Sequence, residues 1–174
     1  MIALGALVRH GVPILVAFAL TSGAPLAQPP TPPHEVTVVG LFINPETGQP
    51  NVALQSRRDR RSFVMSIGAA EANSIAAPLE HRVPPRPLTH DLFLTLFGRL
   101  RVSVTKVVIT DFRDDIYYAT LFLDAGGKEM QLDSRPSDAI ALALRAKAPV
   151  FAEGRVFDKS ERLPPALPPA GPRI

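Results

Sequence analysis

Proline is distributed unevenly along this sequence, and its distribution limits where a folded domain can lie. The chain has 174 residues and 19 prolines, which crowd toward the two ends, whereas residues 56–73 and 88–135 contain none. Proline fixes φ and lacks an N–H group, so it interrupts helix interiors and sheet ladders. We therefore expect one domain of ordinary size over residues 34–158.

The N-terminal residues have the order of charge and hydropathy that is typical of a secretory signal. Arg9 precedes an apolar run over residues 12–20, and small residues follow toward Ala27. This run is shorter than the roughly 20 residues that span a bilayer, so we expect no transmembrane segment after processing. The predicted organisation is a signal peptide over residues 1–27 cut near 23–27, a proline-rich spacer over 28–33, the domain, and a proline-rich disordered tail over 159–174. The predicted location is periplasmic or secreted, or cytoplasmic if the signal is not functional.

Composition narrows the classes of function. Apolar residues make up 46% of the chain and charged residues 20%, as in ordinary globular domains. The formal net charge is only +3, so charge by itself does not indicate a protein that neutralises many phosphates. The chain has no cysteine, which excludes disulfides, thiolate catalysis and cysteine-ligated metal sites.

The pattern of apolar residues predicts strands and helices that are grouped rather than strictly alternating. Residues 36–43 are apolar on both alternating faces, as in a central strand buried on both sides. The other predicted strands cover residues 52–55, 62–67, 102–111, 116–123, 128–133 and 149–151, and three short helices cover residues 69–77, start at Thr89 and start at Pro136. This order predicts a single α+β domain with a mostly antiparallel or mixed sheet.

The second predicted helix carries a clear start signal and many apolar side chains. Thr89 is a residue type favoured as an N-cap. The expected buried stripe of this helix consists of Leu92, Phe93, Leu96, Phe97 and Leu100.

Two predicted helix starts share one pattern: Arg86 and Asp91 flank the start of the second helix, and Arg135 and Asp138 flank the start of the third. Free N–H groups and the helix dipole attract anions at such ends, and a guanidinium can bind phosphate with two hydrogen bonds. If the two starts converge, they form a phosphate site. Alternatively, each aspartate caps its own helix and each arginine pairs locally.

Three sequence blocks carry a resemblance to a known family. They read IGAAEA at residues 67–72, RPLTHDL at 86–92 and DSRPSDAIALA at 133–143. In order and approximate spacing they resemble the signature blocks of the bifunctional nuclease family. The resemblance covers roughly residues 34–158 and implies an α+β domain that degrades both DNA and RNA without marked sequence preference.

The polar residues in these blocks suit phosphodiester hydrolysis, which needs an activated water, charge relief on the phosphate and a protonated leaving group. Carboxylates can hold Mg²⁺ or Mn²⁺, histidine moves protons near neutral pH, and arginine stabilises developing charge. The predicted catalytic residues are His90, Asp91 and Asp138, the phosphate-binding residues Arg86 and Arg135, the metal ligands Asp91, Asp133 and Asp138, and the secondary candidate Glu71. No organic cofactor is expected.

Other interpretations remain open. The paired helix starts also fit a noncatalytic binding module for a nucleotide or another anionic ligand. A third interpretation is a structural subunit whose polar cluster holds a homo-oligomer together. The basic run at residues 57–61 fits either a charged hairpin loop or a surface that follows a nucleic-acid backbone.

Overall fold

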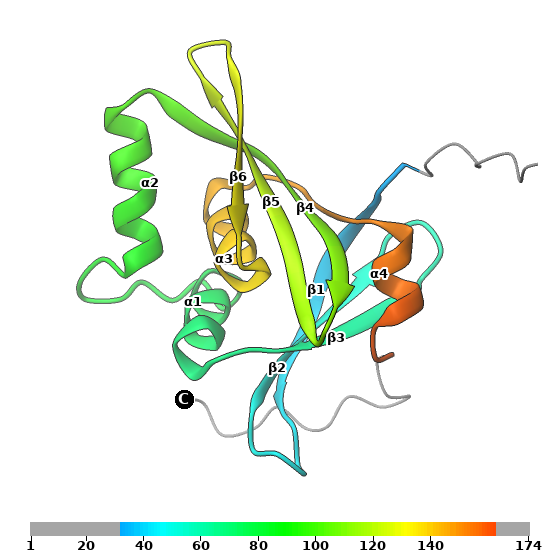
Figure 1. Cartoon of the computed structure of the whole chain (residues 1–174). Coiled ribbons are helices and arrows are strands. Elements are labelled where there is room, and N and C mark those ends of the chain that lie inside the picture. The colour runs from blue at the N-terminus through cyan, green and yellow to red at the C-terminus, as the bar shows by residue number, and fades with distance from the viewer. Residues whose placement is uncertain (1–31, 163–174) are drawn as a thin grey trace, which may run out of the picture. The chain divides into compact units, whose positions relative to one another are not determined.

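A computed structural model describes residues 32–162 of the chain, so the predicted signal peptide, most of the spacer and most of the tail lie outside the described residues. The described residues form a seven-stranded mixed sheet and four helices, which confirms the α+β class (Figure 1). The strands are β1 His34–Ile43, β2 Pro50–Ser56, β3 Ser62–Ser66, β4 Val102–Arg113, β5 Ile116–Ala125, β6 Glu129–Ser134 and β7 Val150–Ala152. The helices are α1 Ala69–Leu79, α2 Thr89–Arg99, α3 Pro136–Ala146 and α4 Gly154–Lys159, of which α4 was not predicted.

The strand order is β3-β2-β1-β7-β4-β5-β6. Neighbouring strands pair antiparallel except β7 and β4, which are parallel. The short strand β7 thus returns from the C-terminal part of the chain and joins two antiparallel groups into one sheet. None of the helices in the described part of the chain is long and apolar enough to cross a membrane.

Hairpin turns form where the local sequence permits their geometry. Asn44 accepts hydrogen bonds from the backbone N–H groups of Glu46 and Thr47, which closes the turn between β1 and β2. Asp114 and Asp115 both have positive φ, as a two-residue turn of the primed type requires, and they connect β4 to β5.

The strand β1 is interior to the sheet, as predicted, because β2 and β7 flank it. The expectation that β1 is buried on both faces is wrong. Val36 and Phe42 are buried, but Thr37 and Val39 are exposed. One face of this strand therefore stays open to solvent along its middle, although its residues there include valine.

The main core lies between the sheet and the helices. Ile140 of α3 and Ile75 of α1 are fully buried, together with Val107 and Ile109 of β4. Helix α4 closes the same core with Val156 and Phe157. Figure 1 shows α1, α2 and α3 grouped together, with α2 outermost.

The predicted buried stripe of α2 is largely wrong. Leu92, Phe93, Leu96 and Leu100 are between 48% and 64% exposed. The side of α2 that packs inward instead carries His90, which is buried, and Leu94 and Phe97, which pack against the core. The helix is apolar around more than half of its circumference, so the sequence period did not indicate which side faces the core.

Candidate functional site

The starts of three helices meet around one arginine. Arg135, the N-cap of α3, donates from Nε to Asp138 Oδ2 at 2.6 Å and from Nη2 to Asp138 Oδ1 at 3.1 Å. The same Nη2 donates to Glu71 Oε1, in the first turn of α1, at 2.9 Å. His90 Nε2, at the start of α2, lies 3.2 Å from Asp138 Oδ1. Four of the predicted site residues, one or more from each sequence block, thus form one connected network.

The local sequence explains how α3 presents its part of the network. Pro136 occupies the first helical position, where its missing N–H is not needed and its φ favours the helix. Arg135 precedes it in an extended conformation, and Asp138 follows in the first turn. The arginine and aspartate therefore lie on the same side of the helix start, where they pair at (i, i+3) spacing.

Asp138 is held in its ionised form. Partial burial raises the pKa of Asp138, but the hydrogen bonds and charge of Arg135, with a smaller effect from His90, outweigh burial and leave the pKa below its ordinary value. The pKa of Arg135 is raised, first by its hydrogen bond to Asp138. The network therefore holds the Arg135 guanidinium against the ionised Asp138 carboxylate, with the Glu71 carboxylate as a second acceptor.

His90 is positioned for proton transfer through one specific nitrogen. An ionised carboxylate only accepts hydrogen bonds, so the contact with Asp138 places a hydrogen on His90 Nε2. In a neutral imidazole the lone pair then lies on Nδ1. That atom is buried and has no hydrogen-bond partner among the described residues. A buried polar atom without a partner costs about 1–3 kcal/mol, which makes Nδ1 the unusual feature of this site.

Asp91 belongs to a different arrangement. Its Oδ2 accepts from the backbone N–H of Leu88 at 2.8 Å, and its Oδ1 accepts from Arg145 Nε at 2.7 Å. Helix α2 begins at Thr89, so its N-cap is Leu88, and the prediction of Thr89 as the N-cap is wrong. The side chain that caps the helix start is the carboxylate of Asp91 in the first turn. Burial raises the pKa of Asp91, but the hydrogen bonds from Arg145 and the Leu88 N–H outweigh burial, so the pKa lies below its ordinary value.

Arg145 was not anticipated from the sequence. It lies in the last turn of α3, its side chain is 9% exposed, and its Nη1 also donates to the carbonyl oxygens of Ser74 and Ala141. It thereby connects α3 with both α1 and α2. The only sequence signal was an arginine that follows six apolar residues, 139–144, in the same helix.

The remaining predicted residues lie near the same elements without joining the network. Arg86 is exposed in the connection that precedes α2, and Asp133 is exposed on β6, where it is in register with Thr120 of β5. Within residues 32–162, neither side chain forms a hydrogen bond or ion pair with Arg135 or Asp138.

The predicted metal ligands do not assemble into a metal site in this arrangement. Across residues 32–162 there is no group of three or more histidine, aspartate or glutamate side chains placed to hold a metal ion. The carboxylates of Asp91 and Asp138 are instead engaged by Arg145 and Arg135. The use of Mg²⁺ or Mn²⁺ stays a prediction from the sequence.

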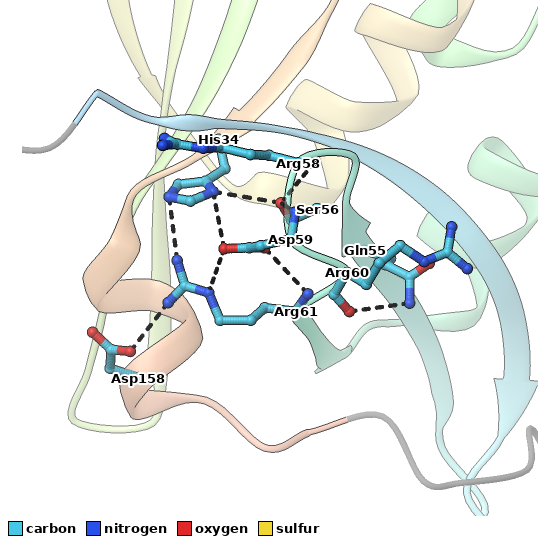
Figure 2. Close-up of polar contacts among 8 residues, drawn as sticks. All are labelled: His34, Gln55, Ser56, Arg58, Asp59, Arg60, Arg61 and Asp158. Carbon is cyan, nitrogen blue, oxygen red and sulfur yellow. Dashed lines mark hydrogen bonds and ion pairs between the residues drawn. The ribbon is translucent and has the colours of Figure 1, made fainter.

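A second polar cluster lies around Ser56, at the C-terminal end of β2 (Figure 2). His34 Nδ1 lies 3.4 Å from Ser56 Oγ and 3.5 Å from Asp59 Oδ2, and His34 Nε2 lies 3.2 Å from Arg61 Nη2. Because arginine only donates, His34 Nε2 accepts and Nδ1 carries the hydrogen. His34 therefore cannot take a proton from Ser56, and the cluster is not a serine hydrolase triad.

The structure also shows which arginines of the basic run at residues 57–61 form ion pairs. Arg61 pairs with Asp59 at 2.9 Å and with Asp158 of α4 at 3.3 Å, and Arg57 pairs with Glu35 at 2.9 Å. The hydrogen bond from Ser56 and the contacts with Arg61 lower the pKa of Asp59 to about 2. Half of the four arginines in this run are thus paired with carboxylates, which supports the interpretation as a charged hairpin loop.

Comparison with known proteins assigns the chain to a family. Residues 52–163 match the bifunctional nuclease domain. The chain belongs to the bifunctional nuclease domain family. The match contains the complete network of Glu71, His90, Arg135 and Asp138, and it starts within β2, after β1.

Relatives of this bifunctional nuclease domain protein occur in bacteria and plants. A Mycobacterium tuberculosis protein, named only as uncharacterised, is 36% identical over 131 residues, which is 75% of this chain and 78% of the relative. Bifunctional nuclease 1 of Oryza sativa subsp. japonica and the bifunctional nuclease of Oryza minuta are each 36% identical over 103 residues. That match covers 56% of this chain and 31% of each plant protein.

Gly68 has a specific role in the network of this family member. It is the N-cap of α1, and a Cβ at this position would collide with Glu71 Oε2. Glycine therefore allows the Glu71 carboxylate to fold back over the helix start, from where it reaches Arg135.

We expect Gly68→Ala to displace the Glu71 carboxylate and break its contact with Arg135. The Glu71 side chain is flexible at its far end, so the free energy of unfolding should change by less than about 1 kcal/mol. A crystal structure of Gly68→Ala checks the position of the Glu71 carboxylate. Thermal unfolding of Gly68→Ala, compared with that of Glu71→Gln, checks the change in stability. An unchanged distance between Glu71 and Arg135 in the crystal structure would contradict the prediction.

Proposed function

We propose that this protein is a nuclease that hydrolyses phosphodiester bonds of DNA and RNA without marked sequence preference. The observation that carries the proposal is the convergence of three family sequence blocks on one histidine–aspartate–arginine network. Membership in the bifunctional nuclease domain family, with plant relatives named bifunctional nucleases, supports the same activity. Export from the cytoplasm remains a prediction from the N-terminal sequence.

His90 is the proposed general acid or base. Asp138 orients the imidazole through Nε2 and leaves the Nδ1 lone pair to accept a proton from the attacking water, after which the protonated Nδ1 can donate to the leaving oxygen. In the part of the chain that the structure describes, Nδ1 is buried without a partner, so substrate binding must open the surface next to α2 before a proton can move. The missing partner of Nδ1 would then be supplied by the substrate or by the water that attacks it.

Arg135 and Arg86 are the proposed phosphate ligands. The side chain of Arg135 is 66% exposed although two carboxylates hold it, so part of the guanidinium already faces solvent. A phosphate competes with Glu71 for that guanidinium, because both offer oxygen acceptors to the same donor. Arg86 is exposed on the approach to α2 and can add a second cation without breaking an existing pair within the network.

A noncatalytic module that binds a nucleotide or another anionic ligand is the second candidate. The observation that favours it is the arrangement of the acidic residues, which in residues 32–162 do not form a metal-binding group. The same helix starts could bind a phosphate without hydrolysing it. Both candidates use Arg135, and they differ in whether His90 transfers a proton.

Activity and binding measurements on the full chain separate the two candidates. Supercoiled plasmid DNA and single-stranded RNA are incubated with the protein in Mg²⁺, in Mn²⁺ and in EDTA. Cleavage of both substrates supports the nuclease, and loss of cleavage in EDTA would support the predicted metal requirement. Thermal stabilisation by nucleotides without any cleavage would favour the binding module.

A further inference from the structure

Helix α2 carries a large apolar surface that no described part of the chain covers. Leu92, Leu96 and Leu100 are spaced four residues apart and lie along one side of the helix, with Phe93 next to them. Their exposed fractions are 64%, 50%, 63% and 48%. We call these four residues the α2 stripe. Helix α2 is the outermost of the three helices grouped with α1 and α3 (Figure 1).

The α2 stripe is large enough for a stable protein interface. At about 200 Å² for a fully exposed large apolar residue, these fractions correspond to roughly 450 Å² of surface in each copy. Two copies that bury their stripes against each other would cover roughly 900 Å². Because apolar atoms make up about 60% of an interface, the complete contact would reach about 1,500 Å², the size of a standard specific complex.

The spacing of the leucines in the stripe fits a second copy of the same helix. When two α2 helices pack antiparallel about Leu96, Leu92 lies opposite Leu100 of the second copy. Three leucine–leucine contacts then lie along the helix pair, and the two helix dipoles are antiparallel, which is their favourable arrangement. Asp91 takes no part in this contact, because Arg145 of its own chain engages its carboxylate.

We propose that this protein forms a homodimer in which the α2 stripes of two copies pack antiparallel about Leu96. An isologous contact of this kind closes on itself and leaves no stripe exposed. The inward side of α2 stays packed on its own domain through His90, Leu94 and Phe97. The dimer therefore places the two candidate sites at opposite ends of the shared helix pair.

Cysteine cross-linking of the full chain tests the register, because the chain itself has no cysteine. In Leu96→Cys the two introduced thiols meet at the symmetry axis, where helices about 8–10 Å apart permit a disulfide. Under mild oxidation we expect Leu96→Cys to form covalent dimers at least about 10-fold faster than Thr95→Cys. Thr95 is the matched control, since it is exposed on the polar side of the same helix. A mixture of Leu92→Cys and Leu100→Cys should cross-link faster than either variant alone.

Sedimentation of the unmodified chain tests the dimer without cross-linking. Leu96→Lys places two ammonium groups at the axis and should raise the dimer dissociation constant at least about 100-fold, whereas Thr95→Lys should not. Circular dichroism of both variants verifies that the fold is retained. A wild-type chain that is monomeric at about 100 μM, or equal cross-linking rates for Leu96→Cys and Thr95→Cys, would overturn the proposal. Flotation of a monomeric wild-type chain with anionic vesicles, abolished by Leu96→Lys, would assign the stripe to a membrane surface instead.

Discussion

Asp138→Asn is expected to lower the rate of DNA and RNA cleavage at least about 100-fold, the scale of general acid–base catalysis. An asparagine amide can donate to His90 Nε2, which would move the imidazole hydrogen to Nδ1. The lone pair would then point at residue 138 rather than toward the substrate. His90→Gln, which removes the imidazole while filling most of its volume, should reduce cleavage by a similar factor.

Matched variants separate this effect from a general loss of structure. Asp158→Asn alters an aspartate on α4 that pairs with Arg61 and lies outside the three signature blocks, so it should leave cleavage unchanged. His81→Asn alters an exposed histidine with positive φ, a conformation that asparagine tolerates. Cleavage that persists in both Asp138→Asn and His90→Gln preparations would show that His90 and Asp138 are not the catalytic residues.

The tautomer of His90 provides a readout that does not depend on activity. The chain contains four histidines, so ¹⁵N-labelled histidine gives few signals, and the His90→Gln spectrum identifies the one from His90. We expect the wild-type imidazole to carry its hydrogen on Nε2 and the Asp138→Asn imidazole to carry it on Nδ1. An unchanged tautomer with a large loss of cleavage would mean that Asp138 acts on the substrate directly.

Asp91→Ala is expected to destabilise the fold by about 3 kcal/mol and to lower the melting temperature by about 10 °C. The substitution leaves the Arg145 guanidinium, with its side chain 9% exposed, without a counter-ion. It also removes the carboxylate that accepts from the Leu88 N–H at the start of α2, which by itself stabilises by about 1 kcal/mol. Because Asp91 is one-third exposed, the loss should lie at the lower end of the range for a broken buried ion pair.

A double-mutant cycle tests whether the ion pair is the cause. Arg145→Met removes the buried charge and keeps much of the side-chain volume. The double variant Asp91→Ala/Arg145→Met should therefore lose less stability than the sum of the two single variants, by at least about 1 kcal/mol. Additive losses in chemical denaturation would contradict the pairing of these two residues as the dominant contribution.

Acid unfolding provides a second test of the same pair. The pKa of Asp91 is lowered in the folded protein, so the ionised carboxylate contributes stability that is fully present above its unfolded pKa of about 3.9. This contribution is lost as the pH falls through the lower, folded pKa. The difference in stability between wild type and Asp91→Asn should therefore be largest near neutral pH and shrink below about pH 4. A difference that is constant from pH 7 to pH 3 would show that the carboxylate charge does not matter.

Local sequence determined much of the fold, because the relevant contacts join residues a few positions apart. Asn44 accepts from the two N–H groups of its own turn, and Asp114 and Asp115 adopt the positive φ that the next hairpin needs. Pro136 starts α3 for the same local reason. The family blocks are also local in sequence, and four of their polar residues meet at the helix starts.

Only the tertiary structure decided how these elements combine. The antiparallel and parallel partners of β7 lie in β1 and β4, far away in the sequence, and three residues of apolar strand do not specify such partners. The sequence likewise did not reveal that Asp91 pairs with Arg145 whereas Asp138 pairs with His90, since both aspartates occupy the same position in their helices.

Helix α2 shows most clearly why the sequence alone did not determine the packing. Its sequence is apolar around more than half of its circumference, so periodicity predicted a helix with a buried side but not which side. The packing of His90, Leu94 and Phe97 against the core settled that choice and left Leu96 exposed. The sequence thus determined that α2 is a helix with apolar residues to bury. The contacts among distant segments determined that its His90 faces the core and that the α2 stripe is left uncovered by the described residues.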